Sequence, residues 1–178
     1  MSLHPKADAY IQSLQGPIPD FLKNLKQQGQ QDQIPIISDE VGQMLQMLCA
    51  LQQPKSILEL GTGIGYSTHW MLLGSPHAAI TSVDANQNRI DLSATFLQQS
   101  GGLEQVRLVC AWVETFLEKN SQSYDLIFID STKKDYPMLL DQCYHALAIN
   151  GLLVADNIFY QGKFNSYVSN EDCIHPIQ

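Results

Sequence analysis

The sequence predicts an α/β fold in which a mostly parallel sheet carries helices on both faces. Five short apolar runs follow one another along the chain, and helix-like stretches separate them. Short buried strands that alternate with helices are typical of right-handed βαβ units, which place successive strands parallel in one sheet. Apolar residues make up 44% and charged residues 16% of the 178-residue chain, a balance that can fill the core of one ordinary domain.

The first 35 residues are expected to form a polar, helical lead-in to a single domain that spans residues 36–178. Pro17 and Pro19 would interrupt the helix of this lead-in. The Gln-rich stretch Gln27–Gln33 is typical of a solvated linker.

A longer helix is expected after the lead-in. Apolar residues recur at helical spacing between Ser38 and Pro54, with Ser38 or Asp39 as the N-cap. We interpret Met44 and Met47 on this helix as core residues.

Strands and helices then alternate to residue 156. The expected strands are 56–60, 79–84, 106–110, 124–130 and 151–156, and the expected helices lie near 66–73, 87–100, 112–119 and 136–147. Ligands of such folds bind beyond the carboxyl ends of the strands, near the point where the strand order switches direction. The loops directly after the strands are therefore where we expect the chemistry.

Charge and composition exclude several classes of protein. Ten Lys and Arg residues against 18 Asp and Glu residues give a formal net charge of −8, which disfavours a protein held to nucleic acid mainly by charge. No stretch approaches the roughly 20 apolar residues that span a bilayer. The N-terminus lacks the basic start and apolar run of a secretory signal, and the four cysteines form no CxxC pair, so we expect free thiols and a cytoplasmic location.

A glycine-rich loop follows the first expected strand. Residues 59–65 read Glu-Leu-Gly-Thr-Gly-Ile-Gly, whereas the dinucleotide fingerprint G-x-G-x-x-G would need its third glycine at Tyr66. Alternating glycines let the backbone approach a ribose and an amino-acid moiety without requiring a pyrophosphate. A tight strand-to-helix turn with no ligand is the weaker interpretation.

The loops after the second and third strands suggest nucleoside recognition. Asp84 lies about 20 residues after the glycines, where a carboxylate can accept hydrogen bonds from a ribose diol. Asp84 alternatively caps the helix that starts near Gln87. In the third loop Ala111 and Trp112 either border an adenine ring, or Trp112 is ordinary core or surface cover.

Acidic residues follow the fourth and fifth strands. Asp130 and Asp156 would project from the same edge of the sheet, with Asn157 beside them. This all-oxygen set suits Mg²⁺ or another hard divalent cation, whereas two independent helix caps are the alternative. Lys133 lies within reach of the same place, where its amine can act as a base or orient an oxygen.

The motifs together resemble the S-adenosylmethionine-dependent O-methyltransferases of the catechol and caffeoyl-CoA type, especially small bacterial members, including those like the tRNA 5-hydroxyuridine methyltransferases. The resemblance extends from about Ile34 to Lys163. The stretches that carry it are IPIISDEVGQML, ILELGTGIGYSTHWM, ITSVDANQNRI, YDLIFIDSTKKDY and GLLVADNIFYQGK.

The resemblance implies a Rossmann-like methyltransferase sheet and a role for each motif. Lys133 would be the catalytic base, and Asp130, Asp156 and Asn157 would bind the metal. The cofactor-binding residues would be Ile37, Glu59, Gly61, Gly63, Tyr66, Ser67, Asp84, Ala111, Trp112, Asp130 and Tyr136. Ile37 would line the methionine end of the cofactor, and Tyr136 would support the cofactor or substrate side.

The chain departs from the family pattern at three places. Thr132 stands where the family often has a second Asp, and Cys110-Ala111-Trp112 replaces a frequent Gly-Asp-Ala. Residues 163–178 do not match the family's C-terminal antiparallel strands, so we expect a C-terminally shortened domain without them. The uncovered edge of the last strand would then favour a homodimer.

The expected activity is methyl transfer from S-adenosylmethionine, assisted by Mg²⁺ or another divalent cation, to a hydroxyl of a catechol-like small molecule. A hydroxylated uridine in tRNA is the alternative substrate. Two other classes stay open: a nucleotide-dependent oxidoreductase, and a cofactor-binding protein without turnover.

Overall fold

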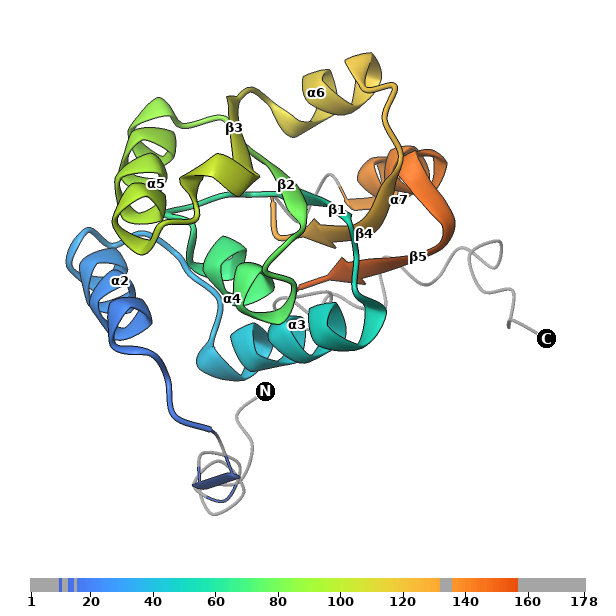
Figure 1. The fold of residues 1–178 in the computed structure, drawn as a ribbon. Coiled ribbons are helices and arrows are strands. Elements are labelled where there is room, and N and C mark those ends of the chain that lie inside the picture. The colour runs from blue at the N-terminus through green and yellow to red at the C-terminus, as the bar shows by residue number, and fades with distance from the viewer. Residues whose placement is uncertain (1–9, 11–12, 15, 132–135, 157–178) are drawn as a thin grey trace.

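The computed structural model describes residues 10, 13–14, 16–131 and 136–156. Its centre is a five-stranded sheet with the strand order β3-β2-β1-β4-β5, in which all four strand pairs are parallel (Figure 1). The strands are β1 (Ser56–Leu60), β2 (Ala79–Asp84), β3 (Val106–Cys110), β4 (Tyr124–Ile129) and β5 (Leu147–Ala155). The predicted α/β fold with a parallel sheet is confirmed. The expected absence of antiparallel C-terminal strands concerns residues outside the described ranges.

The described helices cover both faces of the sheet. They are α2 (Asp20–Gln31), α3 (Asp39–Gln52), α4 (Tyr66–Gly74), α5 (Gln87–Ser100), α6 (Val113–Lys119) and α7 (Tyr136–Ala146), with a short 3₁₀ turn η1 (Leu103–Gln105) before β3. Side chains from α2, α3, α4 and α5 join one hydrophobic cluster, and side chains from α6 and α7 join a second. Neighbouring strand residues alternate between the clusters because successive side chains of a strand point to opposite faces: Ile57 belongs to the first and Leu58 to the second.

Local sequence signals explain where two of the helices begin and end. The Ser38 side chain caps α3 by accepting a 3.4 Å hydrogen bond from the Val41 N–H, as one of the two predicted N-caps does. The Asn86 side chain caps α5 in the same way, and Gly101 ends that helix in the left-handed region with φ +79°.

Strand β5 begins four residues earlier than the expected strand at Gly151. Its pairing with β4 shifts register between Tyr124 and Leu126, whose partners are Leu147 and Leu152. Extra β5 residues therefore bulge out of the ladder, and Asn150 adopts a positive φ of 64° there. The Asn-Gly pair at 150–151, which is typical of a turn, lies inside strand β5.

Two expectations about the N-terminal half are wrong. Gln27–Gln31 is the second half of α2 rather than a linker, because Leu22 and Leu25 of the same helix are buried in the core. Met44 and Met47 are 40% and 54% exposed, since α3 turns Leu45 and Cys49 toward the core instead. The division of the chain at residue 35 stays a prediction.

Two further observations concern cysteines and membrane spans. Cys49, Cys110 and Cys143 are free thiols, as expected, and Cys173 lies outside the described residues. In the part of the chain that the structure describes, none of the helices has the length and apolar character that crossing a bilayer requires.

The exposure pattern of α3 makes a direct prediction about stability. Replacing buried Leu45 by Ala should lower the free energy of unfolding by about 2–5 kcal/mol, because the substitution leaves a cavity. Replacing Met47 by Ala should change it by less than about 1 kcal/mol. Urea unfolding of both variants checks this, and an equal loss in the two would place Met47 in the core after all.

Candidate active site at the strand tips

The carboxyl ends of the five strands form one row along an edge of the sheet (Figure 1). Backbone hydrogen bonds continue between neighbouring chains just beyond the strands: Ala111 N–H to Asp84 O at 3.0 Å, Gly61 N–H to Val83 O at 2.8 Å, Asp130 N–H to Leu60 O at 2.9 Å, and Asp156 N–H to Ile129 O at 3.0 Å. The row therefore runs from Ala111 past Asp84, Gly61 and Asp130 to Asp156. These are the loops that the sequence analysis singled out.

The strand order switches direction between β1 and β4. The chain moves outward from β1 through β2 to β3 on one side, and from β4 to β5 on the other. In open parallel sheets such a switch point leaves a crevice beyond the strand tips, because the adjoining connections cross to opposite faces. Gly61 and Asp130 lie on its two sides.

The alternating glycines are required by the shape of the turn itself. Gly61 has φ +108°, and a Cβ there would lie 2.2 Å from the Asp130 carbonyl oxygen. Gly65 has φ +83°, and a Cβ there would lie 2.6 Å from the Ser93 Oγ. A Cβ on Gly63, which has φ +52°, would meet only the Pro35 carbonyl oxygen at 3.7 Å. The glycines therefore let β1 and β4 approach closely, while the surroundings of Gly63 are open.

Asp84 joins the glycine turn to the loop after β2. One carboxylate oxygen accepts a 3.0 Å hydrogen bond from the Gly63 N–H, and the other accepts a 2.9 Å bond from the Asn86 N–H. Asn86, not Asp84, caps α5, so the alternative that made Asp84 the helix cap is wrong. Each carboxylate oxygen has a further lone pair, which leaves Asp84 able to accept from a ligand as well.

Glu59 supports the glycine turn from behind. Its side chain is fully buried and accepts hydrogen bonds from the hydroxyls of Ser67, Thr68 at 2.6 Å and Ser82 at 2.5 Å. Thr62 of the glycine turn shares a 2.6 Å hydrogen bond with the same Ser82 hydroxyl. Burial raises the pKa of Glu59 to about 7, although the three hydroxyls favour the charged form. The structure gives Glu59 and Ser67 this internal role, and their contact with a cofactor stays a prediction.

Tyr66 also has an internal partner. Its hydroxyl donates a 2.5 Å hydrogen bond to Asp39 Oδ1 at the start of α3, and the Lys26 ammonium of α2 donates a 2.6 Å bond to Asp39 Oδ2. Burial raises the pKa of Tyr66, so the phenol keeps its proton. This cluster ties α2, α3 and α4 together next to the glycine turn. Ile37, just before α3, is 5% exposed and belongs to the core cluster.

Tyr136 fastens the start of α7 to the tips of β4 and β5. Its hydroxyl lies 3.2 Å from the Ile129 carbonyl oxygen and 3.0 Å from the Asp156 carbonyl oxygen. The contact holds the backbone that carries Asp130 and Asp156. A direct contact between Tyr136 and a ligand stays a prediction.

Trp112 lies at the surface directly after β3. It precedes α6 at the N-cap position and is 70% exposed, so the interpretation of Trp112 as a core residue is wrong. Surface cover and the border of an adenine ring both remain compatible with this position next to Ala111.

The expected metal ligands are described only in part. Asp130 and Asp156 follow adjacent, directly paired strands, while Asn157 and the expected base Lys133 lie outside the described residues. Within the described ranges, no group of three or more His, Cys, Asp and Glu side chains is arranged to hold a metal ion. The metal site therefore stays a prediction.

Several residues that shape the site were missed in the sequence. Lys26 gave no signal and Asp39 only that of a candidate N-cap, because the two meet Tyr66 through the packing of three helices. Ser82 did offer one: it is a polar residue inside the apolar run of β2, and such a residue needs a buried partner.

Glu59 makes stability depend on pH. Because its pKa is higher in the folded protein than in the unfolded chain, folding takes up protons between about pH 4.5 and 7. The free energy of unfolding should fall as the pH rises through that interval, by on the order of 3 kcal/mol. Replacing Glu59 by Gln should remove this slope in urea unfolding, whereas replacing exposed Glu118 by Gln should leave it. A slope that persists in the Glu59 variant would contradict the assignment.

Comparison with known proteins agrees with this geometry. A family model described as O-methyltransferase matches residues 13–174. A catechol O-methyltransferase of Niastella koreensis is 29% identical over 143 residues, which are 78% of this chain and 65% of that relative. A putative O-methyltransferase of Mycobacterium sp. strain JLS is 28% identical over 76% of this chain and 63% of its own length. The chain thus spans slightly less than two thirds of these curated relatives.

Solved structures show the same fold. The structure of a putative O-methyltransferase from Klebsiella pneumoniae matches with a TM-score of 0.79 and 28% identity, over 88% of this chain and 73% of that chain. The O-methyltransferase from Bacillus cereus, solved in complex with SAH, matches with a TM-score of 0.82 and 23% identity, over 93% and 79% of the two chains. Because the family model matches most of this chain, the chain belongs to the O-methyltransferase family.

Proposed function

We propose that the protein transfers a methyl group from S-adenosylmethionine to a hydroxyl of a catechol-like small molecule, with the help of a divalent cation. The observation that carries the proposal is the row of Asp84, Gly61, Asp130 and Asp156 across the β1/β4 switch point. Such a reaction needs two groups of residues: a carboxylate that binds the nucleoside, here Asp84, and acids that hold a cation, here Asp130 and Asp156. The relative named catechol O-methyltransferase supports the substrate class.

The residues around the crevice fit a nucleoside ligand. The Ser131 Oγ is buried without a hydrogen-bond partner among the described residues, and the Ser131 N lies 3.4 Å from where a Cβ on Gly61 would be. A buried hydroxyl without a partner is costly unless something else bonds it. Together with the open surroundings of Gly63 and the unused lone pairs of Asp84, this hydroxyl supports a polar ligand near the tips of β1 and β4.

The acidic tips fit a hard cation. Asp130 and Asp156 supply carboxylate oxygens, the ligand type that Mg²⁺ prefers. A bound divalent cation would chelate the substrate oxygens and lower the pKa of the accepting hydroxyl. Asn157 would supply its amide oxygen as a further ligand, a role that is proposed from its place in the sequence alone.

The protein's own residues would then position the reactants and move one proton. The glycine turn and Asp84 would hold the donor so that its methyl carbon lies in line with the accepting oxygen, which supplies much of the acceleration. Lys133, three residues after Asp130, would accept the hydroxyl proton at Nζ. The new O–C bond would form as the C–S bond breaks, with the electron pair of that C–S bond staying on sulfur.

Two substitutions separate the halves of the site. Replacing Asp84 by Ala should weaken S-adenosylhomocysteine binding by about 10- to 100-fold in calorimetry, because a charged acceptor of hydrogen bonds is lost. Replacing Asp156 by Ala should leave that affinity within about threefold and lower the rate of catechol methylation with Mg²⁺ by on the order of 100-fold.

Exposed Asp91 provides the matched control, since its replacement by Ala should change neither measurement. Equal loss of binding in the Asp84 and Asp156 variants would refute this division of roles. A wild-type protein that binds the cofactor but methylates no catechol would be a binding protein instead.

The other classes raised by the sequence gain no support. Tyr66 occupies the place of the third glycine of a dinucleotide fingerprint and starts α4, and the family match favours methyl transfer over a nucleotide-dependent oxidoreductase. The net charge of −8 disfavours tRNA as the substrate. Methyl transfer to a hydroxyuridine-containing tRNA can be assayed beside transfer to a catechol. If tRNA were the better acceptor, tRNA would replace the catechol as the proposed substrate.

The oligomeric state and location stay proposals. Strand β5 is an edge strand of the described sheet, and its run from Leu147 to Ala155 contains no charged residue that would discourage pairing with another strand. A homodimer through this edge fits these features, while the cytoplasmic location is proposed from the sequence alone. Sedimentation should give twice the mass of the 19.9 kDa chain, and a monomer would exclude the dimer.

A further inference from the structure

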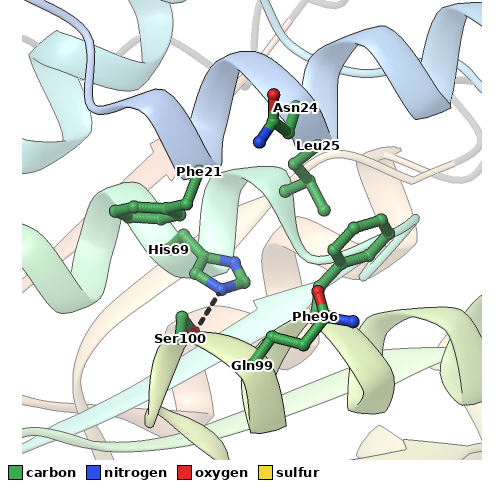
Figure 2. Close-up of a pocket in the computed structure, with 7 residues that line it drawn as sticks. All are labelled: Phe21, Asn24, Leu25, His69, Phe96, Gln99 and Ser100. Atoms are coloured by element: carbon green, nitrogen blue, oxygen red, sulfur yellow. Dashed lines mark hydrogen bonds between the residues drawn. The ribbon is translucent and has the colours of Figure 1, made fainter.

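His69 is a buried histidine on α4 whose ring is bonded on both sides. It is 3% exposed; its Nδ1 lies 2.6 Å from the Gly65 carbonyl oxygen, and its Nε2 lies 2.8 Å from the Ser100 Oγ. Figure 2 shows the ring between α2 and α5, with the bond to Ser100. No role inferred from the sequence falls on His69, so these contacts come from the structure alone.

The partners determine which ring nitrogen carries the proton. A carbonyl oxygen can only accept, so Nδ1 must donate its hydrogen to Gly65. Burial lowers the pKa of His69 and outweighs the Gly65 and Phe96 carbonyls, which favour the charged form. The neutral ring therefore carries its hydrogen on Nδ1, and its Nε2 lies 2.8 Å from the Ser100 Oγ, whose hydroxyl also lies 3.1 Å from the Leu97 carbonyl oxygen.

The Gly65 carbonyl is the last of the glycine turn. It accepts a 3.1 Å hydrogen bond from the His69 backbone N–H in addition to the bond from the ring, and the Gly65 N–H donates to the Thr62 carbonyl oxygen at 2.8 Å. Both peptide groups of Gly65 are thus held, although its φ of +83° lies in the left-handed region. The imidazole thus adds a second bond to the carbonyl group that leads into α4.

Three helices hold the imidazole in place. His69 lies in the wall of a pocket of about 90 Å³, which is lined by Phe21, Asn24 and Leu25 of α2 and by Phe96, Gln99 and Ser100 of α5 (Figure 2). The Phe21 ring lies 5.5 Å from the imidazole, centroid to centroid, and tilted by 49°. The ring therefore connects the packing of α2 and α5 to the glycine turn.

We propose that His69 is a positioning residue for the cofactor: through the Gly65 carbonyl it holds the glycine turn in the conformation that binds S-adenosylmethionine. The proposal rests on the proposed function for the identity of the ligand. The held conformation of the turn is a property of the free protein, and it can be tested without any ligand.

The first test compares His69 variants by calorimetry with S-adenosylhomocysteine. His69→Leu removes the donor, and should weaken binding about five- to tenfold, the effect of losing one hydrogen bond. His69→Asn places an amide N–H where Nδ1 was and should bind within about twofold of wild type. Gln99→Ala changes the same cavity without touching the bond to Gly65 and should bind like wild type.

The second test uses the free protein. Nitrogen NMR should show wild-type His69 with its hydrogen on Nδ1. The Gly63 and Gly65 amides should exchange about five- to tenfold faster in His69→Leu than in His69→Asn or Gln99→Ala. The tautomer is measured on the wild type alone, so it tests the proposal even if His69→Leu folds poorly.

The outcomes separate the two proposals. Failure of wild type to bind S-adenosylhomocysteine would refute the proposed function, while the exchange and tautomer data would still decide whether His69 holds the turn. A hydrogen on Nε2, or equal exchange at Gly65 in the Leu and Asn variants, would overturn the positioning role. Equal loss of affinity in those two variants would overturn it as well, because a merely structural ring would give that result.

Discussion

The close approach of two backbones at the centre of the sheet is the constraint on which the site depends. At Gly61 the chain leaves β1 so near to β4 that a single Cβ would lie 2.2 Å from the Asp130 carbonyl oxygen. This contact places the glycine turn and the acidic tip on opposite sides of the switch point, one residue beyond paired strands. A side chain at residue 61 would push these halves apart, and the row of strand tips would lose its common edge.

A second layer of polar contacts holds the turn that this approach creates. Asp84 bonds Gly63 from the neighbouring loop, the Glu59 cluster of hydroxyls lies beneath the turn, and the His69 ring fixes Gly65. Each contact comes from a different element, so the turn is held in one conformation before any ligand arrives. Such preorganisation lowers the entropic cost of binding, and it explains why so many buried polar groups gather around one short loop.

Much of the fold could be predicted because apolar runs and helical spacing are local properties of the chain. The position of the site could be predicted as well, because parallel strands end at one edge of the sheet. Asp84, Asp130 and Asp156 lie at that edge because each stands at the end of a strand. The partner of Glu59 could not be predicted in this way: Glu59 lies opposite Ser82 only because β1 pairs with β2 in that register.

Which face of a helix is buried could not be predicted from the sequence either. The spacing of apolar residues in α3 allows either Met47 or Leu45 to face the hydrophobic core. The packing of α3 against α4 decides that Leu45 does. Likewise, the glutamines of α2 resemble a linker in composition, although the buried side chains of Leu22 and Leu25 pack the helix against the core.

A crystal structure with S-adenosylhomocysteine bound tests the central claim most directly. The account predicts electron density for the ligand across the β1 and β4 tips, with its ribose hydroxyls on Asp84 and its amino-acid end beside Gly61 and Gly63. Density in the cavity beside His69 alone, or an empty crevice at saturating ligand, would contradict it.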